Sequence, residues 1–387
     1  MLRIAWKMLV GDRGKYAGII IGIALASVIM IQQPGMLLSM LSHTYSFITD
    51  VSLPGIWVMD PQVRYVDDAR AMQDTQLYRV RGVEGVEWAV PLYKGSQKVR
   101  LKNGESVACD LLGLDDATLI GGPALMAQGS LVDLRQPESI IVDETGAQGR
   151  LAQDSQIPGQ PPTPVRVGDV LEINDHRAVV VGIAKSTPSF MGRPVIYTTY
   201  NRAKSFALSE RKNLAFVLTQ AKDGEDAALV ARRITAQTGL AAYTRAEFKE
   251  KSLLYMIKNT NVIINFGFVV LVGFVIGAAV TGQIFYNFTL DNLRYFGVFK
   301  AMGAGRGLLV RMILVQALSV GLIGFGLGAG ASAVFAALMK GGRGPSMSIS
   351  WPLLLGSGGA VLLIVLAAAL ISIRKVLRLE AAVVFKG

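Results

Sequence analysis

Few residues of this 387-residue chain have the types and spacing that enzyme chemistry needs. There are two histidines and one cysteine, Cys109, so a histidine/cysteine zinc cluster and an intrachain disulfide are both excluded. No G-x-S-x-G elbow, no H-E-x-x-H and no G-x-x-x-x-G-K-[ST] phosphate loop occurs. The sequence therefore predicts no catalytic residue, no metal site, no bound cofactor and no nucleotide site of its own.

The remaining polar candidates have simpler structural explanations. Adjacent carboxylates occur at Asp67-Asp68, Asp115-Asp116 and Asp143-Glu144. Such pairs in a soluble domain cap turns and helices more often than they form catalytic dyads. The glycines of Gly303-x-Gly305-x-Gly307 follow no predicted strand, so they predict a helix break and not a nucleotide-binding loop.

Charge is distributed very unevenly along the chain. Residues 1–41 and 259–387 together hold 14 Lys/Arg and three Asp/Glu, whereas residues 42–258 hold 25 of each. The whole formal charge of +11 therefore belongs to two apolar ends that flank a neutral middle segment. Basic residues beside apolar stretches are typical of membrane proteins, and they argue against a nucleic-acid surface in spite of the sequence pI of 9.7.

Four stretches are long and apolar enough to span a bilayer, which takes about 20 residues. They cover residues 17–38, 262–286, 308–338 and 352–373. The first could instead be a signal peptide, with Ala24-Leu25-Ala26 as its cleavage site. An uncleaved span kinked at Pro34 fits better, because the apolar character continues well past Ala26.

The flanking charges predict the orientation. With both termini and residues 287–307 in the cytoplasm, 12 of the 14 basic residues at the chain ends lie inside. Lys340 and Arg343, in the short outer loop, are the exceptions. We therefore expect an α-helical membrane protein with four transmembrane helices and a large α+β extracytoplasmic domain inserted between helices 1 and 2. The predicted domains are 1–41, 42–258 with two subdomains, and 259–387 with an inner loop at 287–307.

The middle segment mixes short strands and helices. Strands are predicted at 55–60, 98–101, 106–112, 139–142, 164–173 and 178–183, with turns at Asn103-Gly104 and Asn174-Asp175. Helices are predicted at 71–81 and 223–238, each followed by a glycine, and 157–164 is predicted to be a proline-rich loop. Residues 245–258 are amphipathic and are expected to continue into the second span as one stiff helix.

Two patterns in the apolar ends suggest contacts. The first is small-residue spacing that lets helices approach closely, either within the chain or at a dimer seam. It involves Gly14, Gly18, Gly22, Gly273 and Gly277, together with four glycines of the third span. The second is the inner loop, whose helical pattern places an aromatic stripe on adjacent turns. An exposed aromatic stripe favours a partner groove over simple contact with lipid.

The stretch FGVFKAMGAGRGLLVRMILVQALSVGLIGFGLG (296–328) and the four-span layout resemble the FtsX/MacB-type ABC transporter permeases. The segments 77–95 and 272–303 are most similar to the DevC-type members of that family. The resemblance covers nearly the whole chain. It implies a MacB-like periplasmic domain and a multi-pass protein of the bacterial inner membrane.

The resemblance also implies partners and a mechanism. A homodimer would work with two copies of a separate ABC ATPase that uses ATP and Mg, a HlyD-type membrane fusion protein and a TolC-type outer-membrane channel. ATP hydrolysis would drive a periplasmic movement that exports a lipid-like or other amphipathic substrate. The inner loop would be the ATPase-coupling helix, with Leu293, Tyr295, Phe296, Phe299, Lys300, Met302 and Gly303 as its site residues.

One position departs from the family pattern. Tyr295 stands where the family often has glutamate, so a contact made by that carboxylate is not carried over. Two other functions stay open: an FtsX-like signalling protein that activates a periplasmic partner, and a lipoprotein-releasing permease. No intramembrane Asp, Glu or His supplies a proton relay, which favours an external energy source.

Overall fold

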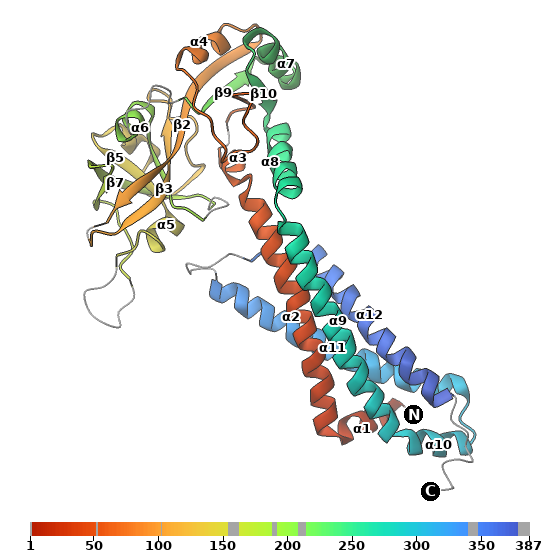
Figure 1. Cartoon of the computed structure of the whole chain (residues 1–387). Coiled ribbons are helices and arrows are strands. Elements are labelled where there is room, and N and C mark those ends of the chain that lie inside the picture. The colour runs from red at the N-terminus through yellow and green to blue at the C-terminus, as the bar shows by residue number, and fades with distance from the viewer. Residues whose placement is uncertain are drawn as a thin grey trace. The chain divides into compact units, whose positions relative to one another are not determined.

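The computed structural model of the chain describes residues 2–51, 53–101, 103–153, 162–187, 192–207, 214–339 and 347–377 (Figure 1). The chain divides into two units. A helical unit comprises Met1–Ser39, Val262–Lys340 and Ser346–Gly387. A sheet unit comprises Met40–Asn261 and Gly341–Pro345.

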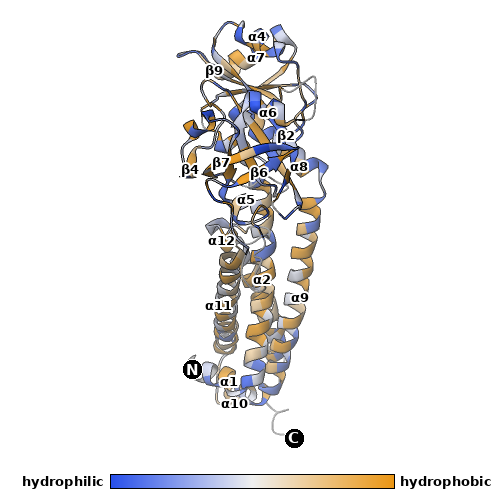
Figure 2. Cartoon of the chain, turned by 90° about the vertical axis from the view of Figure 1, so that its left-hand side faces the viewer, coloured by the Kyte–Doolittle hydropathy of each residue, from blue (hydrophilic) through white to orange (hydrophobic). Residues whose placement is uncertain are grey.

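Four helices of the described part of the chain are long and apolar enough to cross a membrane. They are α2 (Arg13–His43), α9 (Val262–Asp291), α11 (Arg306–Met339) and α12 (Trp351–Leu377). Figure 2 shows the hydrophobic colour running along all four. Each contains one predicted span, and Pro34 lies inside α2, so the four helices are confirmed by length and composition. Lys340 and Arg343, in the predicted outer loop, lie outside the described residues.

The described residues of the helical unit also include two short helices, α1 (Leu2–Gly11) and α10 (Leu293–Ala301). The sequence analysis did not predict α1, whose Leu9 is fully buried in the core of the unit. The predicted inner loop 287–307 is mostly helical: α9 continues to Asp291, and α10 follows directly. Gly303 has φ +92° between α10 and α11, which confirms the predicted helix break.

The sheet unit contains one ten-stranded sheet with the order β10-β1-β9-β2-β3-β8-β5-β7-β4, and β6 pairs with β2 and β7. Pairs β3/β8 and β5/β7 are parallel and the others antiparallel. The strands are β1 (Ile56–Met59), β2 (Val86–Arg100), β3 (Ser106–Leu114), β4 (Leu125–Gln128), β5 (Ser139–Asp143), β6 (Val170–Ile173), β7 (His176–Lys185), β8 (Val195–Thr199), β9 (Phe216–Ala221) and β10 (Ala241–Thr244).

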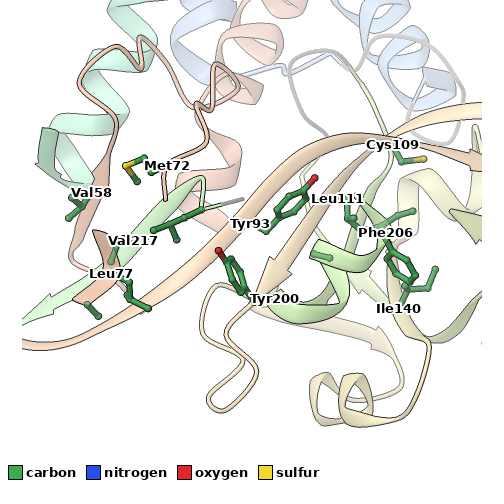
Figure 3. Packing of buried hydrophobic residues seen from close by; sticks show 14 of the residues in the cluster. Val58, Met72, Leu77, Tyr93, Cys109, Leu111, Ile140, Tyr200, Phe206 and Val217 are labelled. Atoms are coloured by element: carbon green, nitrogen blue, oxygen red, sulfur yellow. The ribbon is translucent and has the colours of Figure 1, made fainter. Parts of the chain in front are cut away.

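Both faces of the sheet are buried. Successive residues of β1 alternate between two hydrophobic clusters, with Val58 in one and Trp57 in the other. Figure 3 shows part of the first cluster, including Val58, Leu77 and Val217. Both clusters continue from β1 and β9 to β5 and β8, and the 15-residue strand β2 connects these two parts of the sheet.

Helices connect the strands of the sheet unit and pack beside the sheet. They are α3 (Ser46–Asp50), α4 (Thr75–Arg81), the 3₁₀ helix η1 (Leu131–Arg135), α5 (Glu144–Gln148), α6 (Tyr200–Phe206), α7 (Ala227–Thr238) and α8 (Arg245–Asn259). The helix predicted at 223–238 begins four residues later than expected, because Asp226 caps it through the Ala228 N–H at 3.0 Å. Gly239 ends it in the left-handed conformation, as predicted.

Other predicted boundaries are wrong for local reasons. The helix at 71–81 begins only at Thr75, because the Met72 N–H donates to the Leu214 carbonyl at 2.7 Å. The strand at 164–173 is reduced to β6, because Gly168 adopts φ +94° in a turn. The hairpin between β2 and β3 and the Asn174-Asp175 turn are confirmed. Residues 157–161 of the predicted loop at 157–164 lie outside the described residues.

The expected continuous helix from residue 245 into the second span is wrong. α8 ends at Asn259, and Thr260 is extended, with φ −118° and ψ 139°. Its hydroxyl bonds back to the Met256 carbonyl at 2.5 Å, which offers the backbone an alternative to continued helix. α8 and α9 are therefore separate helices joined by a two-residue link.

Candidate functional site

The candidate coupling segment is α10, a nine-residue helix between the apolar helices α9 and α11. The Asn292 side chain donates to the Phe288 carbonyl at 2.8 Å where the chain leaves α9. The Ala304 N–H donates to the Phe299 carbonyl at 2.9 Å where α10 ends. The C-terminal ends of α9 and α10 are therefore both closed by local hydrogen bonds, which satisfy carbonyls that have no partner within the helix.

Phe296 anchors α10 to the helical unit. Its side chain is 1% exposed and lies in the cluster that contains Leu9, Phe288 and Leu309. Leu293 and Phe299 are half-buried against the same cluster. The predicted exposed aromatic stripe is therefore wrong for Phe296 and Phe299. Both side chains turn inward, because three other helices supply an apolar pocket for them.

The outward side of α10 has a different composition. Tyr295 is 58% exposed, Met302 67% and Val298 38%. Their spacing of three and four residues places them on one side of a helical segment, and the exposed Arg294 lies beside them. We call Arg294, Tyr295, Val298 and Met302 the outer strip. Of the seven predicted coupling residues, only Tyr295 and Met302 belong to it.

The remaining predicted residues have supporting positions. Lys300 is half-buried in the last turn of α10, and Gly303 is exposed in the break that follows. The end of α9 is fastened to the start of α2, because the Lys15 ammonium contacts both Asp291 and Asp12. These three side chains are 35–56% exposed, so the ion pairs orient the helix ends and contribute little stability.

The predicted glycines lie mostly where helices of the same chain cross. A Cβ on Gly277 would be 2.5 Å from the Ala26 Cβ, and one on Gly273 would be 2.6 Å from the Ile29 side chain. Gly22 faces Val280 and Gly18 faces Ile284, at 3.2 and 3.6 Å. These contacts join α2 to α9 and favour intramolecular packing over a dimer seam. Gly14 is exposed and takes no part in this crossing.

The adjacent carboxylates have structural roles. Asp115 accepts from the Thr118 N–H at 2.9 Å, and Asp67 pairs with the nearly buried ammonium of Lys94. Asp143 is 1% exposed, caps α5 through Gly146 N–H at 2.8 Å and accepts from Val195 N–H at 2.7 Å. No group of three metal-ligating side chains occurs among the described residues.

Asp143 makes the stability of the sheet unit depend on pH. Burial raises the pKa of this carboxyl from 3.8 to about 6, although hydrogen bonds from backbone N–H groups, those of Val195 and Gly146 foremost, favour its charged form. The folded state therefore binds the proton on Asp143 more tightly than the unfolded state does. The stability that this proton adds is lost as the pH rises from about 4 to about 6. The stability of the wild type relative to Asp143→Asn should fall over that window by at most about 3 kcal/mol.

Hydrogen exchange at the Val195 and Gly146 amides, measured in both proteins between pH 4 and 7, would show this change after correction for intrinsic exchange rates. If the extra protection of these amides in the wild type, relative to Asp143→Asn, stayed constant or grew with pH, the prediction would be contradicted.

The sequence analysis missed two features of the structure. One is α1, whose ten residues carry no capping signal before a long apolar helix. The other is a groove beside α8, which is formed by residues far apart in the sequence. The charged, amphipathic pattern of residues 245–258 was the available signal for the groove.

Comparison with known proteins adds two family matches. Residues 16–237 match the family described as MacB-like periplasmic core domain, and residues 264–381 match the family described as FtsX-like permease C-terminal. A curated relative, the macrolide export ATP-binding/permease protein MacB of Hahella chejuensis, is 21% identical over 366 residues. The match covers 87% of this chain and 53% of MacB, so the chain spans about half the length of that relative.

Two solved structures are also similar. The extracellular domain of the ABC-type transporter YknZ from Gram-positive bacteria is 15% identical, with 49% of this chain and 98% of that chain covered and a TM-score of 0.33. The periplasmic region of MacB from Actinobacillus actinomycetemcomitans is 12% identical, with 55% and 96% covered and a TM-score of 0.37. Both TM-scores lie below 0.5, so the family assignment depends on the sequence comparisons.

Proposed function

Because this chain belongs to the ABC transporter permeases that combine a MacB-like periplasmic core domain with an FtsX-like C-terminal domain, we propose that it couples ATP hydrolysis in another subunit to movement of its sheet unit. The sequence contains no phosphate-binding loop, and the family implies an ABC ATPase partner. The chain would thus be the permease subunit of an exporter for lipid-like or other amphipathic substrates.

The observation that carries this proposal is that one side of α10 is buried in the helical unit and the other side is exposed. Phe296 fixes one side into the helical unit, and the outer strip leaves Tyr295, Val298 and Met302 exposed. A short helix held between two spans can transmit a push from a bound protein to both of them. Three adjacent exposed apolar side chains are better explained by a partner groove than by solvent.

The wider assembly is part of the same proposal. We place both termini and α10 in the cytoplasm and the sheet unit, inserted between transmembrane helices 1 and 2, in the periplasm. Two copies of the chain would bind two ATPase subunits, a HlyD-type fusion protein and a TolC-type channel. The similarity of residues 77–95 and 272–303 to DevC-type permeases supports this arrangement.

Cysteine labelling would test the topology and the docking together. The only native cysteine, Cys109, is fully buried, so an added cysteine dominates labelling of the folded protein. In intact spheroplasts, a membrane-impermeant maleimide should label Asp223→Cys and leave Met302→Cys unlabelled, and Met302→Cys should cross-link to the ATPase. Equal labelling of both positions would refute the topology, and a missing cross-link would refute the docking.

A further inference from the structure

The sheet unit is connected to the apolar helices at two points of the chain. α3 follows α2 after two residues, and α8 precedes α9 by two residues, Thr260 and Asn261. Ile48 of α3 and Arg245 of α8 are 197 positions apart in the sequence, yet the two helices contact each other within the sheet unit (Figure 1). The chain segments that enter and leave the sheet unit are therefore neighbours in the fold.

Arg245, the first residue of α8, forms hydrogen bonds with α3. Its Nε donates to the Ile48 carbonyl at 3.1 Å, and its Nη2 donates to the Thr49 carbonyl at 2.5 Å. The last carbonyls of a helix have no partner within the helix. A guanidinium suits them, because its N–H groups lie in one plane and point in fixed directions. A side chain of α8 therefore caps the end of α3.

Aromatic side chains join the same two segments. Phe47 of α3 lies 5.6 Å from Trp57 of β1, and Trp57 lies 5.8 Å from Phe248 of α8, measured between ring centres. Trp57 and Phe248 are fully buried. The Lys249 ammonium of α8 lies 4.3 Å from the centre of the Tyr45 ring, directly before α3, which is within the range of a cation–π interaction. Charged hydrogen bonds, aromatic packing and a cation–π contact thus act together.

α3 is also held on the sheet independently of α8. The Asp50 carboxylate accepts hydrogen bonds from the Thr187 N–H at 2.7 Å and from the Thr187 hydroxyl at 3.3 Å. Ile48 is fully buried in the hydrophobic cluster that contains Trp57. Loss of the Arg245 guanidinium should therefore loosen the contact between α3 and α8 without unfolding the sheet unit.

We propose that Arg245 fastens the entering and leaving segments of the sheet unit to each other, so that α3 and α8 move as one body. All of these contacts lie within the sheet unit. A displacement of α2 that reaches α3 is then passed to α8 by side chains, without travelling through the strands between them in the sequence. The fastening is a property of the chain alone, whereas its role in transmission rests on the proposed coupling function.

Hydrogen exchange of the full chain in nanodiscs tests the fastening. The N–H groups of Ile48 and Val51 donate to the carbonyls of Tyr45 and Phe47 at 3.0 and 3.3 Å, so they report on the opening of α3. In Arg245→Met these amides should exchange about fivefold faster, which corresponds to one net hydrogen bond of about 1 kcal/mol. Arg245→Lys retains a charged donor and should restore most of the protection.

Two lysines of α8 provide a matched control. The ammonium groups of Lys249 and Lys251 both lie 4.3 Å from a tyrosine ring centre, but Lys251 contacts Tyr243 of β10 and Lys249 contacts Tyr45. Lys249→Met should speed exchange in α3 by about two- to fivefold, and Lys251→Met should leave it unchanged. The amide of Ile141, a fully buried residue of β5, should keep its wild-type rate in every variant and so report an intact sheet.

Spin-label distances in the complex with the ATPase test the transmission. Asp223→Cys in the sheet unit and Leu362→Cys in α12 place labels at exposed positions, and labelled chain is diluted with unlabelled chain. Trapping the ATPase with ADP and vanadate should shift the distance between the labels. Arg245→Met should reduce this shift or broaden the distribution while the stimulated ATPase rate is retained. A cap that only stabilised α3 would change the exchange rates and leave the distances unaltered.

Three results would overturn the proposal. Exchange in α3 could be unchanged in Arg245→Met, or it could rise equally in Lys251→Met. Alternatively, Arg245→Met could reproduce both the shift and the width of the wild-type distance distribution. A wild-type complex without any shift would contradict the proposed coupling function instead, and the exchange rates would then decide on the fastening.

Discussion

Tyr295→Asp is expected to lower the permease-stimulated ATP hydrolysis of the reconstituted complex by at least about tenfold, because an unpaired carboxylate buried in an apolar contact costs more than the 1.4 kcal/mol that tenfold weaker binding represents. The side chain is 58% exposed in the isolated chain, so the substitution should not disturb folding. Stimulated and basal ATPase rates, measured at equal permease content, give the result.

Phe299→Asp is the informative comparison. Phe299 is half-buried against the core of the helical unit, so a charge there should reduce the amount of folded permease as well as the coupling. Tyr295→Phe keeps the aromatic surface and should retain most of the stimulation. If Tyr295→Asp stimulated the ATPase as well as the wild type, the outer strip would have no role in coupling.

Gly328→Val should prevent the helical unit from packing. A Cβ at Gly328 would lie 2.5 Å from the Ser27 Cβ and 2.7 Å from the Ala24 carbonyl oxygen, and that backbone atom cannot rotate away. Overpacking typically costs about 1–3 kcal/mol, and the two methyl groups that valine carries beyond its Cβ add to it. We expect little monodisperse protein after detergent extraction and size-exclusion chromatography.

Gly326→Val, two residues earlier on the same helix, is the control. A Cβ there meets no atom within 4 Å among the described residues. This variant should elute like the wild type, since its side chain faces the surroundings of the unit. Equal yields of the two variants would mean that α2 and α11 do not cross at Gly328.

The four apolar helices could be predicted from the sequence because a bilayer imposes a length and a composition that are visible in any 20-residue window. The hairpin at Asn103-Gly104 was predictable for a similar reason, since its signal lies in adjacent residues. In contrast, β3 pairs with β8, 85 positions away in the chain (Asp110 with Val195, for example), and β1 pairs with β9 and β10 at still larger separations. No local pattern carries that information.

The same limit of local sequence patterns applies to the coupling segment α10. Sequence periodicity was enough to predict a helix with an aromatic side near residue 296. It could not decide which side would be buried, because Phe296 is covered by Leu9, Phe288 and Leu309 from three other helices. The outer strip consists of the side chains of this segment that the other helices leave exposed.

The link at Thr260 also limits the kind of motion that can pass between α9 and α8. Two residues with extended or irregular backbone contribute four soft torsions, so a rotation of α9 about its own axis would be absorbed there. Their contour length is fixed by covalent geometry, so a pull along the chain is transmitted undiminished once they are taut. The link therefore transmits a pull along the chain from one helix to the other, whereas a rotation of one helix about its own axis does not reach the other.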